Sequence, residues 1–306
     1  MEKIVINGAT GLIGKKLVDF LLCKGYYIVI LTRNYEKAKN TFDSNDKIHI
    51  QEFKRHSPDE LVNLIKGAKS IINLAGASIA GKRWSEKYKK ELYDSRINST
   101  KQIAEAISLT TEKPESFITA SAIGFYQYND EKEFTEDSPP GDDFLSNLCK
   151  DWEKESLSVN KYGVRSVQVR IGLVLDKDGG ALERLVIPFK FFTGAYLGNG
   201  RQWYSWIHCE DLINIIIFSI EKKGIIDGIN ATAPNPMRNK EFSKTIGKVM
   251  RRPCLFFIPG FFLKIVLGEF AQYLIRGQRV IPDKAVANGF SFKYNVLEDA
   301  LINLLK

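Results

Sequence analysis

Short apolar runs alternate with amphipathic stretches over most of the chain. The apolar runs are rich in Ile and Val and are predicted strands, whereas the amphipathic stretches have their apolar positions at helical spacing. The predicted strands are 4–6, 27–31, 48–53, 70–74, 116–120 and 164–171, and the predicted helices are 17–22, 60–65, 86–109, 145–157 and 212–221. This alternation predicts an α/β fold, a doubly wound parallel sheet with helices on both faces. In such a sheet, ligands bind at the carboxyl ends of the strands.

A glycine-rich turn directly follows the first predicted strand. Glycine lets the backbone approach a pyrophosphate, and the start of the following helix offers free N–H groups to its charge. Because strand, glycines and helix are in register, we predict a Rossmann-type dinucleotide-binding turn; an ordinary glycine-rich turn is the alternative. The residues predicted to contact the cofactor here are Gly8, Ala9, Thr10, Gly11, Leu12, Ile13 and Gly14.

The second predicted strand ends in Thr32-Arg33, at the position where dinucleotide-binding folds select their cofactor. An acidic residue here holds the ribose 2′-hydroxyl of NAD, whereas an arginine pairs with the 2′-phosphate of NADP. We therefore expect Thr32 and Arg33 to bind the cofactor, with Lys37 as a second positive charge, and NADP(H) to be preferred over NAD(H). The alternative is that Arg33 is a solvated loop residue.

The composition is that of a large globular protein: 306 residues, 44% of them hydrophobic, with a formal net charge of +8. The lysines are dispersed among acidic residues, which favours a solvated surface over a nucleic-acid site. The four cysteines are scattered and have no metal-ligand spacing, as expected for reduced thiols. No apolar run reaches the roughly 20 residues of a membrane span. The first strand also begins too early for a signal peptide, so we expect a cytoplasmic protein.

Several longer strings identify the chain as similar to the extended short-chain dehydrogenase/reductases, also called the NAD-dependent epimerase/dehydratase family. The general likeness lies in the glycine turn and in residues 98–100, 170–172 and 207–211. A closer likeness is to an atypical branch whose members are labelled "epimerase family protein" or "cell-division inhibitor". The strings that carry it are 73–76, 81–84, 94–96, 121–126, 135–141, 152–153, 206–208 and 230–236.

The resemblance covers nearly the whole chain and implies two parts. It implies a Rossmann-type NADP-binding domain over 1–245 and a smaller C-terminal α/β module of unknown function, on the substrate side, over 246–306. It further implies that Ser121 hydrogen-bonds a substrate oxygen. The additional residues that it places against the cofactor are Leu74, Ala75, Gly76 and Arg96.

The resemblance also reveals a departure from the superfamily. Active members carry a Tyr-x-x-x-Lys pair, in which the tyrosine is the general acid or base and the lysine lowers its pKa. With Glu153 as the anchor, these two positions correspond to Leu145 and Cys149, neither of which performs that chemistry. Tyr128 and Lys132 have the same spacing but lie in a polar stretch predicted as a loop.

Ser121 and Tyr126 are the candidates to replace the missing pair, since both follow the predicted strand 116–120. In this interpretation Ser121 binds the substrate oxygen and Tyr126 presents its phenol to the same cavity. The alternatives are that Ser121 caps the turn and that Tyr126 packs in the core. Asn98 is a further candidate, as a side chain that positions a water.

Two clusters of basic and aromatic residues are predicted on the substrate side, because rings and cations together suit a flat or anionic ligand. The alternatives are a loop held by its own aromatic rings and, for His208 with Asp211, support of a helix start. The first cluster is Lys82 with Trp84, and the second is Arg201, Trp203, Trp206 and His208.

The C-terminal part contains an unusually apolar stretch, 255–258 and 261–263, with Arg251, Arg252 and Lys264 beside it. Three interpretations compete: a wall over the cleft, the surface of a homodimer, or contact with a membrane surface. We expect packing against the main domain first.

These observations predict an NADP(H)-binding oxidoreductase that acts on a small molecule. The absent Tyr-x-x-x-Lys pair keeps a second hypothesis open: a non-catalytic NADP(H)-binding regulator that acts through a partner, for example in cell division. A nucleotide-sugar epimerase or dehydratase is a weaker alternative, because those reactions also depend on the tyrosine.

Overall fold

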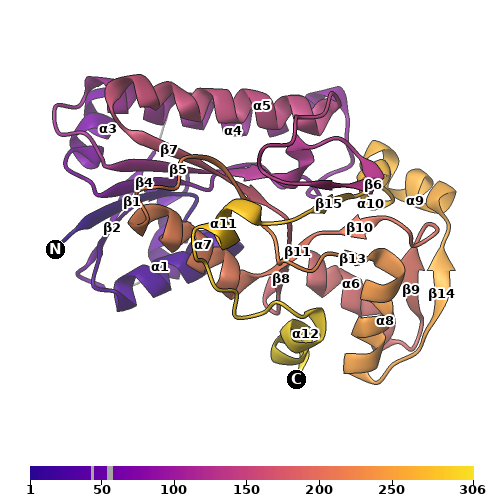
Figure 1. Ribbon diagram of the computed structural model, residues 1–306. Coiled ribbons are helices and arrows are strands. Elements are labelled where there is room, and N and C mark those ends of the chain that lie inside the picture. The colour runs from indigo at the N-terminus through magenta and orange to yellow at the C-terminus, as the bar shows by residue number, and fades with distance from the viewer. Residues whose placement is uncertain (43–44, 54–57) are drawn as a thin grey trace.

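The computed structural model describes residues 1–42, 45–53 and 58–306, and a parallel sheet forms its centre (Figure 1). The seven strands lie in the order β12-β7-β5-β4-β1-β2-β3. The predicted doubly wound α/β fold is confirmed, although the edge strand β12 has no counterpart among the predicted strands. The strands are β1 Lys3–Asn7, β2 Tyr27–Thr32, β3 Ile48–Glu52, β4 Ser70–Asn73, β5 Ser116–Ala122, β7 Arg165–Ile171 and β12 Asp227–Ala231.

Helices cover both faces of the sheet because successive strand residues point to opposite sides. In β1, Ile4 and Ile6 pack with α1 (Leu12–Cys23) and α7 (Cys209–Glu221). Val5 of the same strand packs on the other face, with α3 (Pro58–Ile65) and α4 (Glu86–Leu109). The helix α5 (Phe144–Leu157) lies beside α4 on this second face, and the short α2 (Tyr35–Thr41) follows β2 (Figure 1).

The described residues also form four small two-stranded sheets, which join distant segments that lie mostly in the second half of the chain. The pairs are β6 (Asn129–Phe134) with β15 (Gln278–Val280), β8 (Leu173–Asp176) with β11 (Trp206–His208), β9 (Gly194–Leu197) with β14 (Cys254–Ile258), and β10 (Trp203–Tyr204) with β13 (Met237–Arg238). The helices of this half are α6 Gly180–Lys190, α8 Asn239–Met250, α9 Gly260–Leu267, α10 Ala271–Leu274, α11 Asp283–Ala287 and α12 Leu297–Leu305. Helix α8 runs through the predicted boundary between 245 and 246, and the division into two domains stays a prediction.

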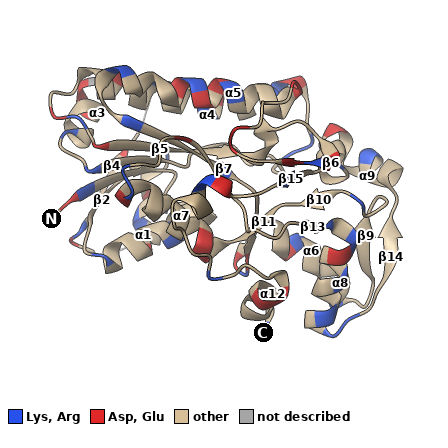
Figure 2. Ribbon diagram, in the orientation of Figure 1, with Lys and Arg blue, Asp and Glu red and all other residues tan. Residues whose placement is uncertain are grey.

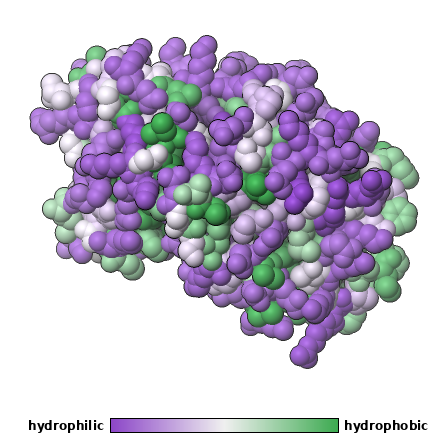
Figure 3. Space-filling view, viewed as in Figure 1, coloured by the Kyte–Doolittle hydropathy of each residue, from purple (hydrophilic) through white to green (hydrophobic). Residues whose placement is uncertain are grey.

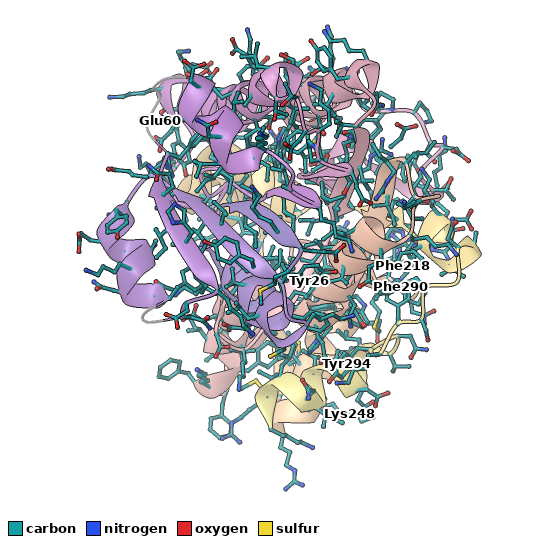
Figure 4. All side chains as sticks on the ribbon, turned by 90° about the vertical axis from the view of Figure 1, so that its left-hand side faces the viewer. Tyr26, Glu60, Phe218, Lys248, Phe290 and Tyr294 are labelled. Carbon is teal, nitrogen blue, oxygen red and sulfur yellow. The ribbon has the colours of Figure 1, made fainter. Side chains whose placement is uncertain are left out.

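The C-terminal segments return to the sheet domain. Phe218 of α7 packs edge-on against Phe290, with ring centroids 5.4 Å apart, and Figure 4 shows the two side chains next to each other. Strand β15 pairs with β6, and α11 packs against the edge strand β12. None of the helices in the described part of the chain has the length and apolarity needed to span a bilayer.

The expected packing of the apolar C-terminal stretch against the main domain is wrong for most of its residues. Leu255, Phe256 and Phe257 of β14 are exposed, as are Phe261 and Phe262 of α9. Within the stretch, Leu263 points inward and is buried. The apolar character of this stretch therefore does not serve the core.

A buried ion pair joins the sheet to α5. Arg170 of β7 donates from Nε and Nη2 to the two carboxylate oxygens of Glu153, at 2.9 Å each, with the side chains only 8% and 7% exposed. The remaining Nη1 donates to Tyr126 Oη (2.8 Å) and to the Glu136 carbonyl oxygen (3.1 Å). Burial by itself would lower the pKa of Arg170, but the hydrogen bonds and charge of Glu153 outweigh it and raise that pKa above its ordinary value.

A second buried carboxylate extends this polar centre toward the C-terminal part of the chain. Glu136 accepts backbone hydrogen bonds from Asn230 of β12 (2.9 Å) and from Lys284 of α11 (3.1 Å). Burial raises the pKa of Glu136, and the two N–H donors oppose that rise. The carboxylates of Glu153 and Glu136 thus hold together β7, α5, β12 and α11.

We expect Glu153→Ala to lower the free energy of unfolding by about 3–5 kcal/mol, because it leaves the guanidinium of Arg170 buried and unpaired. Urea denaturation at neutral pH measures the change. The exposed neighbour on the same helix supplies a matched control, since Lys154→Ala is expected to change stability by at most about 0.5 kcal/mol. Equal stability of the two variants would contradict the importance given to the pair.

Candidate functional site

The loops that follow β1, β2, β4, β5 and β7 meet at one edge of the sheet, because these neighbouring strands are all parallel. The glycine turn 8–14 and the Thr32-Arg33 pair lie there with the loop 74–76 and with Ser121. We call this edge the strand-end site.

The three glycines of the turn have different reasons to be glycine. Gly8 has φ +90°, and a Cβ on it would lie 2.8 Å from Ala75 N. A Cβ on Gly14 would lie 2.4 Å from Gly8 O. At Gly11, however, a Cβ would meet only Gly8 O, at 3.4 Å. The protein's own packing therefore requires Gly8 and Gly14, whereas Gly11 is exposed and leaves open space next to the start of α1.

The start of α1 is suited to an anion. Its N-cap residue is Gly11, so no side chain accepts a hydrogen bond from the first N–H groups, and its first turn contains no acidic residue. Unsatisfied N–H groups and the helix dipole both favour negative charge at such a terminus. Together with the open side of Gly11, this geometry fits the pyrophosphate of a dinucleotide.

Thr32 and Arg33, at the end of β2, have different roles: Thr32 is structural and Arg33 is exposed. Thr32 is buried, and its hydroxyl donates to Asn34 O (3.1 Å) and accepts from Asn34 N (3.2 Å), which shapes the turn into α2. Arg33 is exposed, and no carboxylate among residues 1–42, 45–53 and 58–306 forms an ion pair with it. Its guanidinium is therefore available to a phosphate group.

A second cation, Arg96 of α4, lies against the loop that follows β4. Arg96 of α4 donates from Nη1 to Leu92 O (3.0 Å) and from Nη2 to Ala77 O (2.9 Å), and it lies over the ring of Trp152. Burial lowers the pKa of Arg96, and no carboxylate in the described segments pairs with it. A Cβ on Gly76 would lie 2.9 Å from Arg96 Cζ, and Ala75 touches Gly8, so the residues expected around the cofactor do gather here.

Ser121 and Tyr126 do not face an open cavity. Ser121 is buried and donates to Glu153 Oε1 at 2.7 Å. Tyr126 has no exposed surface; its hydroxyl accepts from Arg170 and donates to Asn230 Oδ1 at 2.7 Å. Burial raises the pKa of Tyr126 to about 12. The structure thus corrects the picture of a presented phenol, since both hydroxyls complete the buried polar centre.

Leu145 and Cys149, at the positions of the usual tyrosine and lysine, lie on α5 behind the end of β5. Leu145 packs beside Gly124, because a Cβ added to Gly124 would lie 3.3 Å from the Cβ of Leu145. Cys149 is buried, with its thiol 3.8 Å from Ala122 O, and burial raises its pKa to about 12. Neither residue exchanges a proton near neutral pH.

The first substrate-side cluster joins the loop after β4 to the C-terminal module. Trp84 is buried, donates from Nε1 to Ile79 O (2.8 Å), and packs against Phe144, Phe270 and Tyr273. Lys82 is exposed and pairs with Glu91 at 3.0 Å. The ring of Trp84 therefore anchors the module, and only Lys82 of this cluster is open to solvent.

The second cluster is split by the fold. Trp203 donates to Asp130 O (2.9 Å) under the guanidinium of Arg238, and Arg201 is exposed. Trp206 is fully buried and donates to Asn235 O (3.0 Å), which leaves no ring face for a ligand. Among the described residues, no hydrogen bond, ion pair or ring contact joins these side chains to Lys82 or Trp84.

His208 supports the start of α7, as in the alternative interpretation. Its Nδ1 accepts from Glu210 N (3.1 Å), and its ring stacks on Tyr294 at 3.9 Å. Burial lowers the pKa of His208. Asp211 beside it accepts from Lys293 N and Tyr294 N, so both residues fasten α7 to the C-terminal segment.

Sequence reasoning did not identify Arg170, Glu136 or Asn230 as partners in the polar centre. The available signal was an arginine inside the apolar run 164–171, because such a charge needs a buried counterion.

Asn98, the further candidate for positioning a water, lines a hollow of about 350 Å³ on α4, with Lys101, Gln102 and Glu105.

Comparisons with known proteins agree with the geometry. Residues 4–174 match the family model described as NAD dependent epimerase/dehydratase family, and residues 258–304 match DUF1731, a domain of unknown function. The epimerase family protein YfhF of Bacillus subtilis is 41% identical over 99% of this chain and 97% of its own length. The chloroplastic SDR39U1 homolog of Arabidopsis thaliana is 40% identical over 97% of this chain and 85% of its own length.

Solved structures give the same assignment. Human epimerase family protein SDR39U1 (isoform 2), determined with NADPH, has a TM-score of 0.87 and 30% identity, covering 99% of this chain and 98% of that one. A UDP-glucuronic acid 4-epimerase from Bacillus cereus, at 19% identity and a TM-score of 0.78 over 98% of this chain and 96% of that one, shares the fold. The expected resemblance is thus confirmed, and the chain belongs to the NAD dependent epimerase/dehydratase family and carries a DUF1731 domain over residues 258–304.

Proposed function

We propose that the protein binds NADP(H) at the strand-end site and is a cytoplasmic oxidoreductase that acts on a small molecule. The observation that carries the proposal is the pairing of two features: the open side of Gly11 at the uncapped start of α1, and the exposed Arg33, which has no acidic partner among the described residues. The human SDR39U1 structure was determined with NADPH, which supports the same cofactor for the present protein.

Each part of the site has a role in this proposal. The backbone of 10–13 would hold the pyrophosphate, and the guanidinium of Arg33 would pair with the 2′-phosphate. Arg96 and the loop 74–76 line the neighbouring part of the site and hold it rigid through Gly8. When bound, the cofactor supplies a hydride, and the protein supplies position and electrostatics.

The residues at the end of β5 limit the chemistry. Leu145 and Cys149 of α5 form an apolar wall behind the end of β5, and the hydroxyls of Ser121 and Tyr126 are already used inside the protein. A substrate that accepts a hydride without a proton from the protein suits such a wall. An iminium group has this property because hydride addition converts it to a neutral amine. An activated double bond has it when the stabilised carbanion formed by hydride addition takes its proton from solvent.

A second function is favoured by the same wall: a regulator that binds NADP(H) without turnover and acts through a partner, for example in cell division. Its supporting observation is the lack of a titrating group at Leu145 and Cys149. Epimerisation or dehydration of a nucleotide sugar is weaker still, because Tyr126 is buried away from any ligand.

Arg33→Ala is expected to weaken NADPH binding by about 10- to 100-fold, as a charge-assisted pair with the 2′-phosphate is lost. Binding of NADH, which lacks this phosphate, should not change. Isothermal calorimetry with both cofactors measures the difference, and Arg201→Ala, an exposed arginine in the 201–208 segment, is the matched control. If wild type binds neither cofactor, or Arg33→Ala weakens both equally, NADP(H) selection by Arg33 is excluded.

Gly11→Ala and Gly14→Ala should separate binding from folding. The first puts a methyl group into the open space beside the start of α1 and is expected to reduce NADPH affinity at least about tenfold, with stability changed by at most about 0.5 kcal/mol. The second forces a methyl group against Gly8 O and should destabilise the fold by about 1–3 kcal/mol. Thermal unfolding and calorimetry on both variants test this, and the reverse order of effects would contradict the assigned roles.

If the protein is an enzyme, kcat for NADPH oxidation should vary less than about twofold between about pH 6 and pH 8.5. The reason is that Tyr126 and Cys149 both have their pKa raised to about 12, so both stay protonated over this range. Absorbance at a fixed NADPH concentration, with iminium and activated-alkene substrates, measures the profile. A titration that Tyr126→Phe removes would assign proton transfer to the phenol instead, and no turnover with any substrate would favour the regulator.

A further inference from the structure

One edge of the molecule carries a large apolar surface that the fold leaves outside. Every residue in it is between 53% and 77% exposed. Monomeric proteins rarely leave so many large apolar side chains together in water unless the surface binds something. This edge patch consists of Phe191, Phe192, Leu255, Phe256, Phe257, Phe261, Phe262, Ile265 and Val266.

Contacts between its three segments make the patch continuous. At one end, Arg252 lies over the ring of Phe192, 4.2 Å from its centroid, next to the start of β14. Strand β14 then pairs with β9 along its length, and Phe257 stacks on Tyr196. At the other end α9 begins directly after Pro259. Figure 1 shows β14 and α9 along one margin, and Figure 3 shows hydrophobic surface at the same margin.

Helix α9 has its apolar face turned outward. Phe261, Phe262, Ile265 and Val266 share one side of the helix, because at 3.6 residues per turn these four positions fall within an arc of about 140°. Leu263 is the residue of this helix that is buried. The core therefore holds α9 through a small contact and leaves its strongest hydrophobic face in solvent.

The charges around the patch have one sign. In 189–200 and 251–268, which contain the patch, the charged residues are Lys190, Arg251, Arg252 and Lys264, with no Asp or Glu. Figure 2 shows basic segments on α9 and at the turn between α8 and β14. The acids next to these segments, Glu241 of α8 and Glu269 of η3 (Gly268–Phe270), pair with Lys244 and Lys89. The acid of α6, Glu183, lies in the first turn of that helix, at the end away from Phe191.

We propose that the edge patch docks the protein on an anionic lipid bilayer. Its phenylalanines would enter the interface while Lys190, Arg251, Arg252 and Lys264 meet the headgroups, the combination of apolar area and cations that interfacial binding requires. A second copy of the chain fits less well. A two-fold dimer would put the same cations opposite each other, with no carboxylate of the patch to neutralise them.

The proposal is tested by co-sedimentation of the full chain with phosphatidylcholine vesicles and with vesicles that also contain phosphatidylglycerol. Wild type is expected to bind the anionic vesicles and not the neutral ones. Phe261→Ser with Phe262→Ser should reduce the partition coefficient at least about tenfold. Lys190→Glu with Lys264→Glu should reduce it by a similar factor, and this loss should shrink at high salt.

Matched controls use exposed residues elsewhere on the molecule. Leu109→Ser with Ile226→Ser removes the same kind of apolar side chain, and Lys222→Glu with Lys223→Glu makes the same change in net charge. Both should bind like wild type, and circular dichroism of all variants checks the fold. Absence of binding to anionic vesicles would overturn the proposal. So would a wild-type dimer in lipid-free ultracentrifugation that Phe261→Ser with Phe262→Ser makes monomeric.

Discussion

The paired charges of Arg170 and Glu153 are the constraint that most of the site depends on. A guanidinium inside a parallel sheet requires a full set of acceptors, and the fold supplies them from α5, from Tyr126 and from the backbone of Glu136. This arrangement fixes α5 against the ends of β5 and β7, so that Leu145 and Cys149 lie behind the strand-end site. It also removes the hydroxyls of Ser121 and Tyr126 from contact with any ligand. The same polar centre therefore stabilises the protein and decides which groups are left for chemistry.

The central sheet follows from the sequence because its inner strands are buried on both faces. Continuous Ile and Val runs have few other places in a globular fold, and 4–6, 27–31, 70–74 and 164–171 became β1, β2, β4 and β7. The edge strand β12 reads Asp-Gly-Ile-Asn-Ala, and its Asn230 serves the polar centre, so its pattern does not resemble that of a buried strand. The short pairs of the second half join residues far apart in the chain, which no local pattern reveals.

The geometry of the glycine turn was predictable from the sequence, whereas the direction of the candidate side chains was not. The glycines at 8, 11 and 14 belong to a local turn, and the structure gives each a distinct spatial reason. Tyr126, Trp206 and His208 have the right residue types for a ligand site, but their rings point inward because Arg170, Asn235 and Tyr294 lie there. The apolar residues of 255–262 were expected to be buried but are mostly exposed. A hydrophobic sequence predicts that something covers it, but not whether the same chain does so.

The C-terminal module has two sides with different uses. Its inner side completes the fold: Phe270 and Tyr273 enclose Trp84, whose loop follows β4 and leads back to Ala75 and the glycine turn. Its outer side is the edge patch on α9, which η3 (Gly268–Phe270) connects directly to the ring cluster around Trp84. Packing in the core explains Phe270 and Tyr273 but not the exposed apolar face of α9, which precedes them in the chain. Because the inner contacts already hold the module in place, the outward phenylalanines are best understood as a surface built for contact outside the chain.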